Sequence, residues 1–204
     1  MKQHEDFLEL LQIDYERYPV IAVVGGRKSN LIYRFTEELL NRDKKVIIST
    51  GHISEDTKLP FVPNGEVGLL EEVLKKEGYA VVAEYEEETG KYRVLKENKL
   101  EELRRMCDVL LIEIHKRKLR PETRADWLNI LPKCTKLIVS VIELDGLGEP
   151  VSQSTYREER TAELLRKDLN APITQEDIRK IAASICALIK DVEEKVYRVY
   201  HMGN

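Results

Sequence analysis

Cysteine is scarce in this sequence. Only three occur among 204 residues, at Cys107, Cys134 and Cys186, and no two of them are near each other along the chain. An odd number of widely spaced cysteines suggests neither a disulfide framework nor a zinc knuckle. The composition therefore fits a reducing compartment, the cytoplasm.

Long apolar runs and charge of one sign are lacking as well. No run reaches membrane-spanning length, and the first residues, MKQHEDFLELLQI, lack the apolar core and cleavage site of a signal peptide. The 33 basic and 37 acidic residues are mixed along the chain, with a net charge of -4 and no charged tail. This balance argues against nucleic acid as the main partner. We expect a soluble, cytoplasmic protein that binds neither nucleic acid nor membrane.

Repeats and low-complexity segments are also missing, and what remains is a regular alternation of elements. With 42% hydrophobic residues, the chain can bury a core in one domain, which we predict to span residues 1–204. Apolar runs alternate with amphipathic stretches, as is typical of α/β proteins. Most of the expected strands are continuous apolar runs, which favours parallel strands covered on both faces. They cover residues 19–24, 45–49, 79–85, 108–113, 136–142 and 196–200.

Helices fit between these strands. We expect them at 4–12, 29–42, 66–77, 98–106, 123–131, 156–168 and 174–190. The last of these has a capping start at Thr174-Gln-Glu-Asp177. The segments YAVVAEY and KYRVL are separated by a Thr89-Gly90 turn signal, so they are predicted to form a small hairpin insertion. The predicted fold is α/β, a mainly parallel sheet flanked by helices.

One stretch after the first expected strand has the order of a phosphate-binding loop. The sequence VVGGRKSNL follows an apolar run and leads into an amphipathic helix. Backbone N–H groups of a glycine turn and the positive end of the next helix attract phosphate. Lys28 would add a point charge, and Ser29 could ligate Mg²⁺. The predicted phosphate-binding residues are Gly25, Gly26, Arg27, Lys28, Ser29 and Asn30.

Other polar residues follow the remaining strands, and ligands of open parallel sheets gather at the carboxyl ends of the strands. Glu113 ends an apolar strand, where an acidic residue commonly reaches a magnesium ion or its water. We predict Lys28 and Glu113 as catalytic residues, and Ser29 and Glu113 as metal ligands. The other candidate site residues are Thr50, His52, His115, Asp145 and Arg157.

Each of these features also has a simpler interpretation. The glycine pair fits a tight strand-to-helix turn, and Arg27 and Lys28 fit solvated residues of a first helical turn. Glu113 fits an ion-paired residue at a strand end. His52 and His115 fit hydrogen-bonded loop histidines.

Several segments, taken in order, resemble the selenium-dependent hydroxylase accessory proteins of the YqeC family, which look like phosphate-loop NTPases. The segments are VIAVVGGRKSNLIYRFTEELLNRDKKVIISTGHI, DVLLIE, KLIVSVIELDGLGEPV, TYREE and APITQEDI. The resemblance covers nearly the whole chain, and LDGLGEPV is its most specific part. It implies a phosphate-loop NTPase-like three-layer sandwich, ATP or GTP with Mg²⁺ as cofactor, and a molybdenum hydroxylase or its maturation proteins as partner.

The sequence departs from the family pattern where nucleotide chemistry would occur. Family loops carry a Gly-x-Gly-Gly-Lys-Thr core, whereas here only Gly25-Gly26-Arg27 precede Lys28-Ser29. The loop is one residue shorter, and the β-carbon of an arginine obstructs both the turn and the phosphate oxygen. His115 and Lys116 replace the family's Asp-Gly. Tyr156-Arg157-Glu158-Glu159 is all that remains of a His-Arg-Pro-Glu-like motif.

Three functions stay open at this point. The first is a divergent accessory protein with a nucleotide-binding fold, weak or lost NTP hydrolysis, and an implied role in maturation of a selenium-dependent molybdenum hydroxylase. Such a protein could also work without any cofactor. The second is an active Mg-dependent NTPase that uses Lys28, Ser29 and Glu113. The third is a metal- or anion-binding protein with a site of His52, Glu113 and His115, a donor set that suits zinc.

Overall fold

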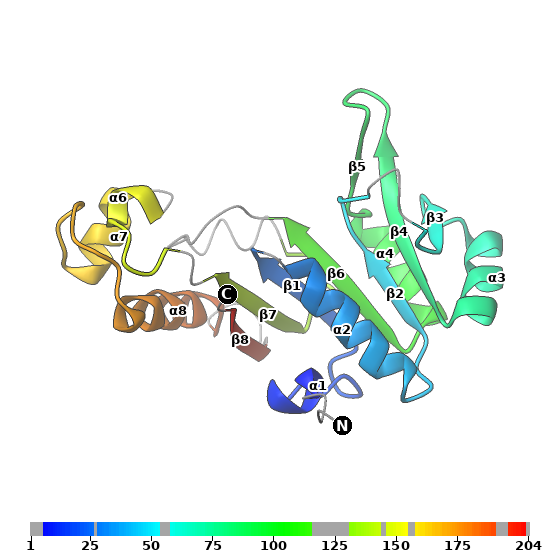
Figure 1. Cartoon of the computed structure of the whole chain (residues 1–204). Helices are drawn as coiled ribbons and strands as arrows, with labels where there is room; N and C mark the ends of the chain where they lie inside the picture. Colours follow the sequence, from blue (N-terminus) through cyan, green and yellow to red (C-terminus); the bar gives the residue numbers. More distant parts are fainter. Residues whose placement is uncertain are drawn as a thin grey trace.

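A parallel sheet organises the molecule (Figure 1). The computed structural model describes residues 6–26, 28–53, 58–115, 131–143, 146–154, 158–190 and 196–202. Seven strands are hydrogen-bonded in the order β3-β4-β2-β6-β1-β7-β8, all of them parallel, and β5 pairs antiparallel with β4. The strands are β1 (Val20–Gly25), β2 (Val46–Ser49), β3 (Phe61–Pro63), β4 (Tyr79–Glu86), β5 (Lys91–Arg93), β6 (Val109–His115), β7 (Leu137–Glu143) and β8 (Val196–Met202).

Helices pack on both faces of this sheet, which confirms the predicted α/β class and its three layers. Side chains of β1 alternate between the faces: Ile21 and Val23 pack with α1 and α2, and Ala22 packs in the core that includes α3, α4, α7 and α8. The helices are α1 (Phe7–Leu10), α2 (Lys28–Leu40), α3 (Val67–Glu77), α4 (Glu97–Leu103), the 3-10 turn η1 (Arg104–Met106), α6 (Val151–Ser154), α7 (Glu158–Leu165) and α8 (Gln175–Lys190).

The sequence pattern predicted most of these elements but missed two short ones. β3 is a three-residue edge strand that contains Pro63, and α6 is a four-residue helix directly after Pro150. Neither is long enough to show a period, and proline argues against a strand. The expected helix at 98–106 ends in the 3-10 turn η1, and most of the expected helix at 123–131 lies outside the described residues.

The predicted hairpin is present. β4 and β5 pair antiparallel with Tyr85 opposite Tyr92, and the turn between them ends at Gly90, whose φ of +64° is readily adopted by glycine. In Figure 1 this hairpin extends past the carboxyl ends of the neighbouring strands. It therefore rises from the edge of the sheet where the candidate site residues lie.

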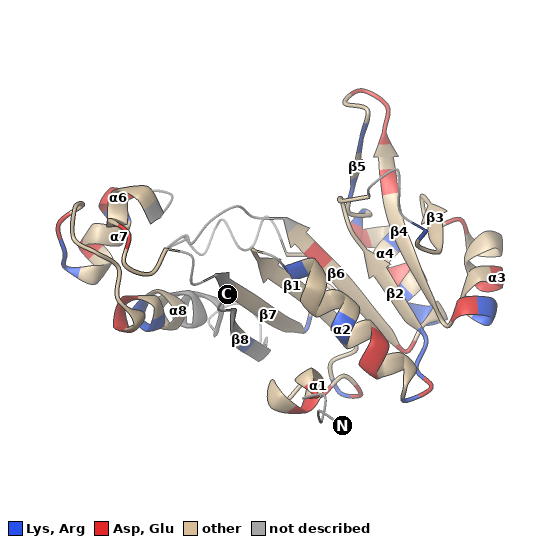
Figure 2. Ribbon diagram, viewed as in Figure 1, with Lys and Arg blue, Asp and Glu red and all other residues tan. Residues whose placement is uncertain are grey.

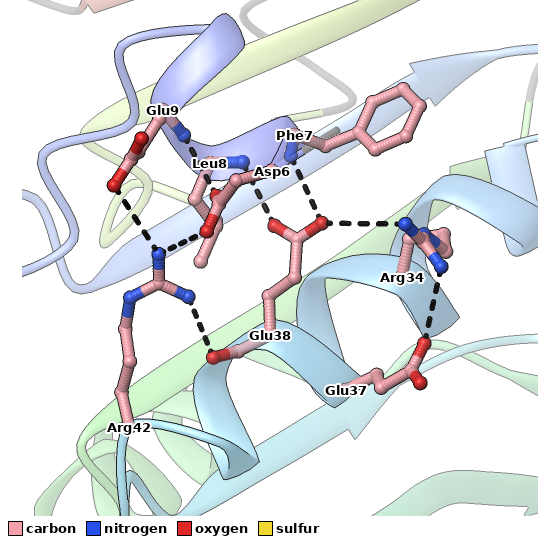
Figure 3. A network of polar contacts seen from close by, with 8 residues as sticks. All are labelled: Asp6, Phe7, Leu8, Glu9, Arg34, Glu37, Glu38 and Arg42. Carbon is pink, nitrogen blue, oxygen red and sulfur yellow. Dashed lines mark hydrogen bonds and ion pairs between the residues drawn. The ribbon is translucent and has the colours of Figure 1, made fainter. Parts of the chain in front are cut away.

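The N-terminal helix is held against α2 by one buried carboxylate (Figure 3). The two oxygens of Glu38 accept hydrogen bonds from the backbone N–H groups of Phe7 and Leu8, each at 2.9 Å. These N–H groups belong to the first turn of α1, where no carbonyl of the helix itself can serve them. Arg42 reinforces the contact through an ion pair with Asp6.

We expect Glu38→Ala to lower the free energy of unfolding by about 1–3 kcal/mol, because two N–H groups lose their acceptors. Glu37→Ala is the matched control: this neighbour is exposed, forms an ion pair with Arg34 on the surface of α2, and should change stability by at most about 0.5 kcal/mol. Urea denaturation of the two variants measures the difference. Equal effects would contradict the assigned role of Glu38.

The start of α8 has the predicted capping arrangement. Asp177 is buried, and its Oδ2 accepts from the backbone N–H of Thr174 at 2.8 Å, from the Thr174 hydroxyl at 2.6 Å, and from Lys167. Burial by itself would raise the pKa of Asp177, but the hydrogen bonds from Lys167 and Thr174 hold the pKa below its ordinary value of 3.8.

A carboxylate with a lowered pKa stabilises the fold above the unfolded-state pKa, and this contribution is lost as the pH falls through the folded-state value. We therefore expect Asp177→Asn to be clearly less stable than wild type at about pH 6, and the gap to shrink toward about pH 2.5. Urea midpoints at both pH values measure this. Glu176→Gln changes an exposed neighbour and is the control. Its urea midpoint should differ little from that of wild type at either pH.

Within the described ranges, no helix combines the length and the apolar character that a membrane span requires.

Candidate functional site

The register of the sheet brings three strand ends together. β6 lies between β1 and β2, with Glu113 opposite Val23 of β1 and Ile112 opposite Ser49 of β2. Thr50 directly follows Ser49, so it stands beside Glu113. The glycine turn begins at Gly25, which is the last residue of β1, at the carboxyl edge of the sheet as predicted.

Glu113 is the centre of the polar contacts at this edge. Its side chain is buried, and its Oε1 accepts a hydrogen bond from the Ser29 hydroxyl at 2.9 Å. Its Oε2 accepts from the Thr50 hydroxyl at 2.5 Å. Lys28 Nζ lies 3.6 Å from Oε1 and forms an ion pair with it. Residues of α2, β6 and the segment after β2 thus meet on one carboxylate.

Lys28 is buried rather than solvated. Its side chain is 4% exposed and that of Glu113 is 6% exposed, so the simpler interpretation of Lys28 as a solvated residue is wrong. In Figure 2 the blue segment at the start of α2 lies beside the red segment near the end of β6. A positive side chain at the start of a helix opposes the helix dipole, and α2 has no acidic residue in its first turn. Glu113 on β6, the strand that neighbours β1, supplies the negative charge that balances Lys28.

The charge of Glu113 also reaches the next turn of α2. Tyr33 lies four residues after Ser29, on the same side of the helix, and is partly exposed. Burial raises the pKa of the Tyr33 phenol, and the negative charge of Glu113 raises it further. Tyr33 is not among the predicted site residues. Its spacing of four residues from Ser29 places it on the same face of the helix, and this is the signal that could have identified it.

Gly25 is required by the packing of the sheet. Its φ is +109°, and a β-carbon at this position would lie 1.9 Å from the carbonyl oxygen of Val141 on β7. Only glycine allows both the backbone conformation and this close approach of the neighbouring strand. The turn interpretation of the glycine pair is therefore correct for Gly25, whatever the turn also binds.

We expect Gly25→Ala to destabilise the protein by about 2–5 kcal/mol, because backbone strain and collision with β7 add together. Gly148→Ala is a matched control: its φ is +87°, yet nothing lies within 4 Å of the added β-carbon. It should cost about 1–2 kcal/mol from strain alone. Urea denaturation measures both, and equal losses would show that the approach of Val141 is unimportant.

The segment after β2 connects this site to the hairpin. The Thr50 hydroxyl oxygen accepts from the backbone N–H of His52 at 2.9 Å, while His52 itself is exposed. A β-carbon on Gly51 would lie 3.3 Å from both the Cα of Arg93 and the carbonyl oxygen of Tyr92. The segment from Thr50 to His52 therefore touches Glu113 on one side and β5 on the other.

The structure describes only some of the remaining predicted residues. Asn30 is exposed in the first turn of α2, and Gly26 follows β1 at the turn. The backbone of His115 ends β6 opposite Gly25, but its side chain is outside the described part. Arg27, Asp145 and Arg157 also lie outside the described residues.

A metal site of His52, Glu113 and His115 stays a prediction. Across the side chains that the structure describes, no three His, Cys, Asp or Glu groups gather in a way that could hold a metal ion. The side chain of His115 is not among them, so the third candidate function remains untested.

Cys107 and Cys134 are free thiols whose pKa values are raised. Burial raises the pKa of the Cys107 thiol to about 12. Burial, together with the carboxylate of Glu97, raises that of Cys134 to about 12 as well. Thiols with such pKa values carry almost no thiolate at neutral pH.

A family model described as YqeC protein matches residues 21–159, which is more than half of the chain. The chain belongs to the YqeC protein family. The matched region runs from β1 to the start of α7 and includes Lys28, Ser29, Thr50 and Glu113. A comparison with curated proteins found no match.

Proposed function

We propose that this protein is a divergent nucleotide-fold accessory protein that binds a magnesium nucleotide weakly and hydrolyses it slowly or not at all. The observation that carries this proposal is the buried Lys28, placed at the start of α2 with Ser29 and facing Glu113. A buried ammonium, a helix N-terminus and a hydroxyl at one point form a set of groups suited to phosphate.

The chemistry of the donors also fits magnesium. Mg²⁺ prefers hard oxygen ligands and is commonly held by one or two carboxylates, waters and the phosphates of the nucleotide. Glu113 and Ser29 offer a carboxylate and a hydroxyl oxygen within 2.9 Å of each other. These two residues would hold the ion. The nucleotide with its metal would supply the phosphate chemistry.

Slow hydrolysis follows from the contacts of Glu113. One oxygen of Glu113 accepts from Thr50, and the other, beside Ser29, would hold the metal ion, so the carboxylate is poorly suited to take a proton from an attacking water. The family resemblance adds that His115 and Lys116 stand where the family pattern has Asp-Gly. The short loop with Arg27 beside the lysine would weaken binding for the geometric reason given above.

Calorimetry with Mg-ATP and Mg-GTP, combined with a phosphate-release assay, tests the proposal. We expect weak binding of at least one nucleotide, and phosphate release no faster than that of Lys28→Ala. Metal-dependent release that disappears in Lys28→Ala would instead support an active NTPase. Absence of binding to either nucleotide at millimolar concentration would overturn the proposal.

A repaired loop gives a sharper form of the same test. Insertion of a glycine after Gly26 together with Arg27→Gly should restore backbone donors at the start of α2. One charge-assisted hydrogen bond contributes about 1.5–3 kcal/mol, so the nucleotide should bind about tenfold more tightly or better. If the repaired protein binds no better, the weakness lies elsewhere, and His115 with Lys116 are the next positions to change.

The partner follows from the family resemblance alone. We propose that the accessory role concerns a molybdenum hydroxylase or its maturation proteins, and that it takes place in the cytoplasm. Two measurements would test this in cells that express a selenium-dependent hydroxylase. The first is co-purification of the hydroxylase or its maturation proteins with this protein, and the second is the selenium content of the hydroxylase in cells with and without this protein. An unchanged selenium content of the hydroxylase in cells lacking the chain would contradict the proposed role.

A further inference from the structure

The ammonium of Lys28 lies beside the same oxygen of Glu113 that, together with Ser29, would hold a metal ion. The ammonium is 3.6 Å from Glu113 Oε1, the same oxygen that accepts from Ser29. Both charged side chains are almost completely buried. Because little water can screen the pair, a divalent cation approaching Oε1 would meet strong repulsion from the ammonium.

The two hydroxyls beside Glu113 have different roles in this arrangement. The Thr50 hydroxyl donates to Glu113 Oε2 and accepts from the backbone N–H of His52, so both directions of its bonding are used. The Ser29 hydroxyl donates to Oε1, and its oxygen retains lone pairs that can face a cation. Thr50 is therefore a positioning residue that orients the carboxylate, whereas Ser29 can join it as a ligand.

We propose that Lys28 acts as an internal counter-cation that blocks the metal position on Glu113, so that a divalent cation and a nucleotide phosphate each bind more tightly when the other is present. The proposal rests on the proposed function, because the phosphate that attracts Lys28 away from Glu113 belongs to the nucleotide. A phosphate at the start of α2 offers the ammonium a new anionic partner. The carboxylate then becomes available to the cation or to one of its waters.

This arrangement makes the two binding events thermodynamically linked. If phosphate removes the ammonium from Oε1, it raises the affinity for the cation, and the cation must raise the affinity for phosphate by the same factor. Magnesium alone then leaves the site as it is. If the nucleotide binds without a cation, Lys28 turns to the phosphate and Glu113 is left as an unpaired buried charge. The free-energy cost of that unpaired charge offsets part of the gain from the contact between Lys28 and the phosphate.

The block can be tested without any nucleotide. Mn²⁺ replaces Mg²⁺ at sites of oxygen ligands and is counted directly by electron paramagnetic resonance. In the nucleotide-free protein we expect little Mn²⁺ binding to wild type and at least tenfold tighter binding to Lys28→Met, because the variant lacks the competing charge. Lys28→Gln serves as a second variant that keeps a polar end group for Glu113, in case the methionine variant does not fold.

Two controls assign the gain to this carboxylate. Adding Glu113→Gln to Lys28→Met should abolish the new Mn²⁺ site, since the ligand is removed with the block. Lys99→Met deletes another lysine that is paired with an acid, Glu102 at 3.0 Å on the surface of α4, and should leave Mn²⁺ binding unchanged. Folded Lys28 variants that bind Mn²⁺ no better than wild type would overturn the proposal, as would tight Mn²⁺ binding by the wild type itself.

Calorimetry of wild type with ATP, in EDTA and in magnesium, separates this proposal from the proposed function. Binding that is at least tenfold tighter with magnesium supports the linkage. Equal affinities under both conditions overturn the linkage and leave nucleotide binding standing. A Mn²⁺ gain in the Lys28 variants without nucleotide binding under either condition overturns the proposed function, while the electrostatic block by Lys28 stands.

Discussion

A carboxylate buried at the end of a parallel strand has to be hydrogen-bonded and balanced in charge, and the arrangement around Glu113 follows from this requirement. Ser29 and Lys28 come from the first turn of α2, and Thr50 comes from the segment after β2. Leaving such a charge without its partner typically costs about 3–5 kcal/mol. The same contacts that could bind a ligand therefore also hold α2, β6 and the end of β2 together.

This double role explains why the simple and the functional interpretations of these residues are both partly correct. Glu113 is ion-paired, as the simpler interpretation supposed, but its partner is the lysine of the expected phosphate loop. Gly25 belongs to a tight turn, and that turn lies at the start of the helix that carries Lys28 and Ser29. A residue that balances charge in one state of a protein can bind a ligand in another.

The sequence predicted features that depend on composition and period, and missed those that depend on contact. Continuous apolar runs such as DVLLI identified buried parallel strands, and the order of strand, glycines and helix located the turn. The hydrogen bond between Thr50 and Glu113 could not be predicted, because it depends on the order of strands in the sheet. β2 and β6 are neighbours in the sheet although three other strands lie between them in the sequence. The approach of Val141 to Gly25 is likewise a property of the β1 and β7 register. Short elements such as β3 carry too few residues for any periodic signal.

Gly25 also determines how the turn can change shape. Because the carbonyl of Val141 leaves no room at this residue, Gly25 is fixed to the sheet and cannot take part in a rearrangement of the loop. Any change in the course of this turn therefore has to occur on the helix side of Gly25. An inserted residue, such as the glycine of the repaired loop, can be accommodated only on the helix side of Gly25. Such an insertion would move the first turn of α2 and leave the central strands where they are.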